Sequence, residues 1–137
     1  KQALNKLLPR ESETKEADLA LLSLIYPYNI VTAEQREQIL RNVEEKLMRN
    51  KGIIRYEGDR YYHKDGEAEW CFGFPWLAVI YKNAGNMSKY RFYMQKTMDT
   101  MTDDDEIPEL YFANSDEYNE NTPLGWAQAM FLVAVNG

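Results

Sequence analysis

The chain has 137 residues, of which 45% are hydrophobic and 28% charged, so it is expected to form one globular domain rather than a disordered segment. Its net charge of −6 argues against nucleic acid or an anionic membrane as a partner, because both attract a surplus of Lys and Arg. One cysteine, Cys71, excludes an internal disulfide and a cysteine-rich zinc site.

The first two predicted helices differ in how much of their surface is apolar. Residues 15–26, "KEADLALLSLIY", are apolar on nearly every side in their second half, which predicts a helix buried all round and ended by a proline. "TAEQREQILRNVEEKLMRN" follows with a capping box, Thr32 and Gln35, and we expect this second helix to end at Gly52. Its apolar residues fall on one stripe, typical of a half-exposed helix: Ile39, Leu40, Val43 and Leu47.

Three further helices are predicted in the second half of the chain. "PWLAVIYKNAG" carries Pro75 in its first turn and is mostly apolar. "TPLGWAQAMFLVAV" is apolar apart from Gln128, with Thr122 as the expected N-cap and Pro123 at the first helical position. Between them, "SKYRFYMQKTMDTM" has one apolar face, made of Tyr90, Tyr93, Met94, Thr97, Met98 and Met101.

The alternation of buried and amphipathic helices predicts an all-α fold of helical hairpins in two concentric layers. Both long connections, residues 51–74 and 102–121, lead from an outer helix to an inner one, so they should lie on one face. Long loops at one end of a rigid scaffold are where a binding site is expected. Five helices cannot close a ring, so apolar surface should remain for missing sequence or for self-association with a second chain.

The two long loops carry motifs that resemble those of glycoside hydrolase family 15, the glucoamylases. "GIIRYEGDRYY" followed by "FPWLAVIY" resembles the family's Arg-Tyr-x-x-Asp-x-Tyr and Pro-Trp signature. "IPELYF" resembles the loop of its catalytic base, and "NTPLGWAQAMFLVAV" resembles its last inner helix. "LIYPYNIV" and "GEAEWCFGFPWLA" look closest to a bacterial branch, which also resembles the amino-terminal region of phosphorylase kinase alpha and beta subunits.

The resemblance covers residues 19–137 and implies a barrel of six inner and six outer helices, an (α/α)6 toroid. The chain, as a single domain 1–137, would be the carboxyl-terminal portion of that barrel. The chain begins at Lys1 without a methionine, which also suggests a trimmed part of something longer. Its single cysteine suits a reducing compartment, and we expect a cytoplasmic location.

Resemblance to the family assigns chemistry to a few residues. Glu109 would be the general base of an inverting glycosidase, which needs two carboxyl groups across the scissile bond. The residues alone also allow Glu109 to be a solvated loop glutamate. Arg55 matches the sugar-binding arginine, and its alternative is a salt bridge to Asp59 or Glu57. The remaining substrate-binding candidates are Tyr56, Asp59, Trp76 and Trp126. Alternatively, Asp59 orients Arg55, and the two tryptophans are packing residues.

The other polar residues of the sequence do not indicate a second catalytic site or a metal site. Glu67 and Glu69 are expected to be solvated, with pocket lining as the alternative. His63 has no partner at ligand spacing and the run Asp103–Asp105 lacks the spacing of a calcium loop, so no metal or other cofactor is expected. Cys71 has no activating neighbour and is expected to be a packing residue.

The combined hypothesis is part of an inverting, exo-acting glycoside hydrolase that releases glucose from α-linked glucans or maltooligosaccharides. The fragment itself is expected to be inactive, because the family's general acid lies upstream of every motif present. Two alternatives stay open: a non-catalytic glucoamylase-like module for regulation or glycan binding, as in phosphorylase kinase, and a purely structural helical-repeat interaction domain. The last alternative predicts that Arg55, Glu109 and Trp76 do not cluster in space.

Overall fold

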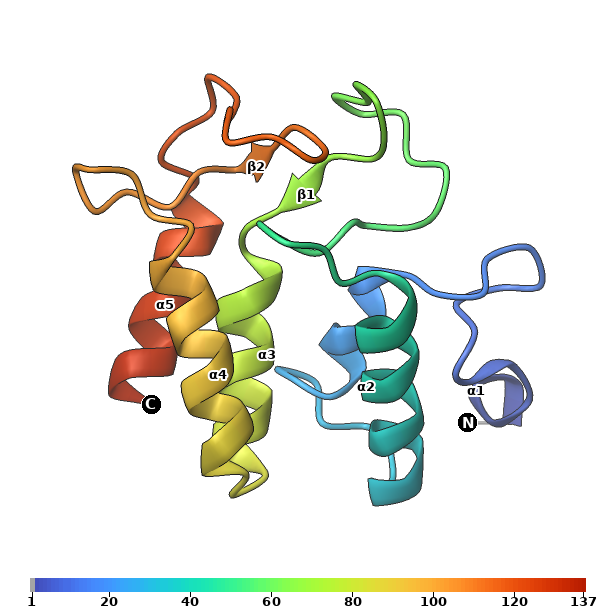
Figure 1. Cartoon of the computed structure of the whole chain (residues 1–137). Helices are drawn as coiled ribbons and strands as arrows, with labels where there is room; N and C mark the ends of the chain where they lie inside the picture. The colour runs from blue at the N-terminus through green and yellow to red at the C-terminus, as the bar shows by residue number, and fades with distance from the viewer. Residues whose placement is uncertain (1) are drawn as a thin grey trace.

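The molecule consists of a layer of helices with two long loops rising from one end of it (Figure 1). The computed structural model describes residues 2–137 and the side chains of residues 5–137; Lys1, the first residue of the predicted domain, lies outside the described residues. Apart from one two-stranded sheet the described elements are helical, which confirms the all-α class. In chain order they are α1 (Gln2–Leu7), the 3-10 helix η1 (Leu19–Leu24), α2 (Ala33–Lys46), β1 (Glu69–Trp70), α3 (Gly73–Asn83), α4 (Met87–Met98), β2 (Leu110–Tyr111) and α5 (Gly125–Asn136).

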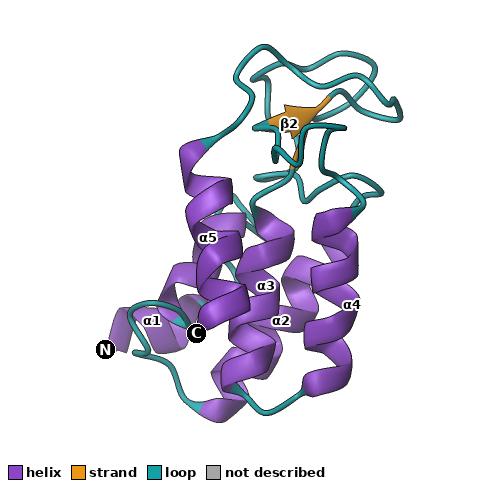
Figure 2. Ribbon diagram, turned by 90° about the vertical axis from the view of Figure 1, so that its left-hand side faces the viewer, coloured by secondary structure: helices purple, strands orange, loops and turns teal. Residues whose placement is uncertain are grey.

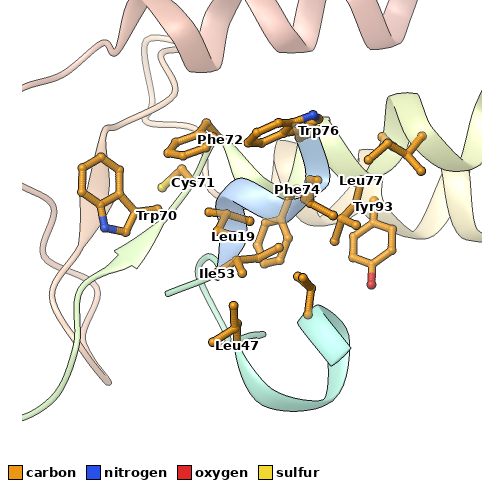
Figure 3. Packing of buried hydrophobic residues seen from close by; sticks show 14 of the residues in the cluster. Leu19, Leu47, Ile53, Trp70, Cys71, Phe72, Phe74, Trp76, Leu77 and Tyr93 are labelled. Atoms are coloured by element: carbon orange, nitrogen blue, oxygen red, sulfur yellow. The ribbon is translucent and has the colours of Figure 1, made fainter. Parts of the chain in front are cut away.

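Helix α3 is the centre of the core and contacts α4, α5 and η1. Its residues from Gly73 to Tyr81 are all buried, which confirms that "PWLAVIY" forms a buried helix. Phe74 and Leu77 of α3 meet Leu19 of η1 and Ile53 in the core (Figure 3). The buried helix α3 therefore supports the end of the molecule from which the two long loops rise.

Helix α2 begins as predicted but ends earlier. The capping box is present, with Gln35 N donating to Thr32 Oγ1 (3.2 Å) and Thr32 N donating to Gln35 Oε1 (2.9 Å). The helix ends at Lys46 and not at Gly52, because residues 49–52 form a turn in which Arg49 N donates to Gly52 O at 2.8 Å. Gly52 instead permits a close approach of two segments, since a Cβ there would lie 2.6 Å from the Glu69 backbone.

Residues 15–26 do not form the predicted buried α-helix; only a 3-10 helix, η1, is present. It begins where the Asp18 side chain accepts a hydrogen bond from Ala20 N (2.8 Å). Leu19 N is already bonded to Arg55 O at 2.8 Å, which ties this segment to the first long loop. The predicted burial holds for part of the segment, at Ala17, Leu19, Leu21, Leu22 and Ile25.

Thr122 is not the N-cap of α5, contrary to the prediction. The helix starts at Gly125 with Leu124 as N-cap and no side-chain cap bond, while Thr122 Oγ1 donates to Asn119 O at 3.0 Å. The hydroxyl is therefore used inside the preceding loop and is not available to the helix.

Helices α4 and α5 expose apolar side chains. On α4, Tyr93 and Thr97 are buried as expected, but Met98 is 46% exposed and does not belong to the buried face. On α5 only Ala127 and Ala134 are buried. The expected uncovered apolar surface is thus present on this helix, at Trp126, Leu132, Val133 and Val135. Among the described residues, no helix has both the length and the apolar character required to cross a bilayer.

Both long loops rise at the end where α3 and α5 begin, as predicted (Figure 2). Strands β1 and β2 join them as an antiparallel pair, with Glu69 opposite Tyr111 and Trp70 opposite Leu110. The prediction that Glu69 is solvated is wrong. The residue is 2% exposed, and its carboxylate accepts hydrogen bonds from Lys51 N (2.9 Å) and Asn114 N (3.1 Å). A buried carboxylate that accepts hydrogen bonds from both loops fixes the position of one loop relative to the other.

Candidate active site

Glu109 lies at the junction of the two loops, directly before β2. Its backbone is held on both sides, because Cys71 N donates to Glu109 O (3.1 Å) and Glu109 N donates to Asn121 O (3.2 Å). The residue is only 8% exposed. Glu109 is therefore not the solvated loop glutamate that its sequence position alone would allow.

The Glu109 carboxylate sits among polar donors. Its Oε2 accepts from Asn119 Nδ2 at 2.5 Å and from Asn121 Nδ2 at 2.8 Å. The Tyr61 hydroxyl is a more distant donor, 3.4 Å from the same oxygen. Partial burial and then the charge of Glu109 raise the pKa of Tyr61, so the phenol stays protonated as a donor. An ionised carboxylate only accepts hydrogen bonds, so this set of donors suits it.

Arg55 and Asp59 form a bidentate ion pair beside this group. Arg55 Nε and Nη2 donate to the Asp59 carboxylate at 2.6 and 2.8 Å, and Asp59 is 1% exposed. Burial alone would raise the pKa of Asp59, but hydrogen bonds from Arg55 and from Tyr61 N lower it overall. The salt-bridge reading of Arg55 is thus correct, and no described residue accepts a hydrogen bond from its Nη1.

A cavity of about 720 Å³ opens next to Arg55, between η1, the first long loop, α3 and α5. Four of the predicted site residues line it: Arg55, Tyr56, Trp76 and Trp126. Trp126 is 51% exposed and its ring stacks on Phe72, with centroids 4.3 Å apart. Trp76 is 3% exposed and donates from Nε1 to Tyr26 O at 2.9 Å, so most of its ring packs into the wall (Figure 3).

Tyr61 lies between Glu109 and Arg55, and Arg55 lines this cavity. Its ring stacks on Trp70 at 5.5 Å, and its centroid lies 5.1 Å from the Arg55 guanidinium carbon. Glu109 and Asp59 do not line the cavity themselves: Asp59 is bonded to Arg55, and Glu109 is reached through Tyr61. The predicted residues therefore form one continuous region, contrary to the reading as a purely structural repeat domain.

Several residues of this region were not singled out from the sequence. Asn119 and Asn121 stand two residues apart, a spacing that places side chains on one face of an extended segment, so the pattern "Asn-x-Asn" was an available signal. Phe72 offered none beyond its aromatic ring, and Tyr61 was part of the quoted Arg-Tyr-x-x-Asp-x-Tyr motif but was given no role. Cys71 is fully buried and burial raises the pKa of its thiol, which confirms the packing assignment. Within residues 2–137, no group of three His, Cys, Asp or Glu side chains is arranged to hold a metal ion.

Known proteins that resemble this chain are glycosidases. No family model matches it. An uncharacterised glycosyl hydrolase of Methanocaldococcus jannaschii is 28% identical over an alignment of 137 residues, which covers 88% of this chain and 22% of that protein. A wild-type glycosidase structure shares 19% identity and a TM-score of 0.70, over 87% of this chain and 35% of that one. A glycosidase variant in complex with glucose gives 20% identity and a TM-score of 0.68, again over 87% and 35%.

The chain is thus glycosidase-like in sequence and fold. At this level of identity the solved structures establish the helical fold, and the sequence match to the archaeal protein adds the relationship to glycosyl hydrolases. The chain spans about a fifth of that curated relative and about a third of the solved glycosidase chains.

Proposed function

We propose that this chain is the carboxyl-terminal part of a family 15, glucoamylase-like (α/α)6 barrel. The whole enzyme would release glucose, with inversion, from the non-reducing ends of α-linked glucans such as maltooligosaccharides. The observation that carries the proposal is the buried carboxylate of Glu109 among neutral donors, joined through Tyr61 to an arginine and an aromatic cavity. An arginine with a spare donor and exposed rings suit a sugar, which presents hydroxyl groups at its edge and C–H groups on its faces.

In the proposed reaction Glu109 acts as general base. A water molecule attacks the anomeric carbon and gives its proton to Glu109, while a second carboxylic acid protonates the departing glycosidic oxygen. In inverting enzymes these two groups stand about 6.5–9.5 Å apart to leave room for the water. We assign the second acid to a part of the protein outside this chain, so residues 1–137 alone should be inactive.

Arg55 would bind the sugar mainly through Nη1, because Nε and Nη2 already donate to Asp59. Trp126 and Tyr56 would contact the ring faces in the cavity, while Trp76 mainly supports the wall. Asp59 then acts indirectly, by fixing the direction in which the guanidinium points.

Glucose release from maltotriose by the full-length protein that contains this chain tests the proposal. Glu109→Gln should lower kcat by roughly 10²–10⁴-fold, the usual contribution of a general base. Glu106→Gln is the matched control, because Glu106 lies in the same loop and its side chain has no hydrogen-bond partner among the described residues. Wild-type hydrolysis that survives Glu109→Gln unchanged would contradict the base assignment.

A non-catalytic glycan-binding module is the second candidate. It is favoured by the segment "GEAEWCFGFPWLA", which departs from the shorter glycine-rich loop of fungal glucoamylases and whose Glu67 and Glu69 bond to loop backbone. Maltotriose binding without any hydrolysis would favour this candidate over the enzyme.

A further inference from the structure

All three donors at Glu109 converge on the same carboxylate oxygen. Asn119 Nδ2, Asn121 Nδ2 and the Tyr61 hydroxyl point at Oε2, and no described residue donates to Oε1. The two oxygens of one carboxylate are chemically equivalent in water, so the protein environment alone distinguishes them here.

Backbone pairing fixes the two asparagines relative to Glu109. Tyr118 forms a bridge with Tyr111, Asn119 N donates to Leu110 O (3.3 Å), and Glu109 N donates to Asn121 O (3.2 Å). The amides of Asn119 and Asn121 are therefore presented together toward the same carboxylate.

The orientation of Asn119 is dictated by Glu109. Asn119 is 2% exposed, and its buried Oδ1 has no hydrogen-bond partner in the described part of the chain. Turning the amide over would place Oδ1 against Oε2, where two acceptors repel each other. The side chain thus donates to the carboxylate and leaves its own buried acceptor unmatched, which destabilises the fold. The bond to Glu109 therefore determines the orientation of this amide.

Oε1 keeps some exposure to solvent. The buried side-chain polar atoms without partners within the described residues are Arg36 Nε, Trp70 Nε1 and Asn119 Oδ1. Glu109 Oε1 also has no partner but is not among these buried atoms, so it keeps contact with solvent. A water molecule can therefore reach Oε1, while Oε2 is occupied.

We propose that Asn119 and Asn121 are positioning residues that hold Oε2 and leave Oε1 as the oxygen that takes the proton from the attacking water. This inference rests on the proposed function, since it presumes that Glu109 is the base. The bond from Asn119 is shorter and buried, whereas Asn121 is exposed. Asn119 therefore contributes more than Asn121 to the orientation of the base.

The test measures kcat and KM for maltotriose in the full-length protein. Asn119→Ala and Asn121→Ala are each made in the wild-type protein and in a Glu109→Ala background. Asn119→Ala should lower kcat roughly 10- to 100-fold, in line with the loss of a hydrogen bond to a charged group, and Asn121→Ala by about 3- to 10-fold. KM should stay within about twofold, because the asparagines orient the base and do not bind ground-state substrate.

The Glu109→Ala background separates positioning from other roles. Residues that act only through Glu109 have nothing left to orient there, so both substitutions should be silent on the residual rate. Glu120→Gln is the matched control, since Glu120 lies between the two asparagines but accepts from Tyr62. It should leave kcat within about twofold of wild type. Circular dichroism checks folding, and the exposed Asn121 supplies a variant that folds even if Asn119→Ala does not.

Four results would overturn the inference, and they fall into two classes. If the full-length protein lacks hydrolysis, or Glu109→Ala keeps wild-type kcat, the proposed function fails and the inference fails with it. If Glu109→Ala strongly lowers kcat but the asparagine variants keep wild-type kcat, or lower the residual rate further in the Glu109→Ala background, only the positioning role fails.

Discussion

Replacing Asp59 by asparagine tests whether this buried carboxylate holds Arg55 in place. In the wild-type protein Asp59 accepts two hydrogen bonds from Arg55, at 2.6 and 2.8 Å, and one from Tyr61 N at 3.1 Å. Asparagine has nearly the same shape, but it lacks the charge and presents an amide NH₂ to one of the guanidinium donors. The substitution therefore breaks the ion pair without creating a cavity.

The expected loss of stability follows from burial on the two sides of the pair. Breaking a fully buried pair costs about 3–5 kcal/mol. The Asp59 side chain is 1% exposed but that of Arg55 is 35% exposed, so the arginine recovers part of its hydration. We therefore expect the free energy of unfolding to fall by about 2–3 kcal/mol at pH 7, and Tm by roughly 6–12 °C.

The stabilisation that Asp59 contributes changes with pH in a defined direction. Because the pKa of Asp59 is lowered in the folded protein, its stabilising contribution is present above the unfolded value near 3.8 and is lost as pH falls through the lower folded pKa. The difference between the wild type and Asp59→Asn should therefore shrink in acid.

Urea unfolding followed by tryptophan fluorescence measures this difference, with Asp116→Asn as the control. Asp116 also pairs with a cation, Lys51 at 2.9 Å, but its side chain is 90% exposed. The control should change the free energy of unfolding by no more than about 0.5 kcal/mol. If Asp59→Asn is no more destabilising than Asp116→Asn, Asp59 does not hold Arg55.

Tyr93→Phe should lower the free energy of unfolding by about 1–2 kcal/mol, because the buried hydroxyl of Tyr93 donates to Glu44. Thermal unfolding measures this change. Tyr118 is exposed, so the control Tyr118→Phe should change the free energy of unfolding by no more than about 0.5 kcal/mol. Burial, followed by the Glu44 carboxylate, raises the pKa of Tyr81 and Tyr93. Since unfolded tyrosine ionises near pH 10, stability should fall above pH 10 by about 1 kcal/mol per pH unit for each of the two groups, and Tyr93→Phe should lessen that slope in alkaline urea titrations. The Cys71 thiol should resist a thiol reagent until the protein unfolds, and rapid labelling under native conditions would contradict its burial.

Local sequence signals predicted the fold where the interaction partners are close in the chain. The capping box of Thr32 and Gln35 involves residues three apart, and it is present. Thr122 had the same kind of local signal for α5, but its hydroxyl bonds to Asn119 O instead. The apolar run of residues 15–26 likewise predicted burial but not conformation, since Leu19 N bonds to Arg55 O in a distant loop.

The site shows the same division between local and long-range information. Glu69 and Glu109 both stand in aromatic loops, and apart from the resemblance of "IPELYF" to a catalytic-base loop, nothing within a few residues tells them apart. Glu69 is satisfied by backbone N–H groups on two loops, whereas Glu109 is held by side-chain amides ten and twelve residues further along. The pairing of β1 with β2 brings Asn114 to Glu69, whereas the bridge between Tyr111 and Tyr118 brings Asn119 and Asn121 to Glu109. Pairings this short have too little pattern to be recognised in sequence.

The most direct test of the proposed function is the anomeric form of the first product. Proton NMR of the full-length protein acting on maltotriose should show β-glucose before mutarotation, because a base-activated water attacks the face opposite the α-linked leaving group. Glu109→Gln should abolish that signal, and Glu106→Gln should preserve it. Initial release of α-glucose, or β-glucose formed at an undiminished rate by Glu109→Gln, would contradict the role of Glu109 as the general base of an inverting glycosidase.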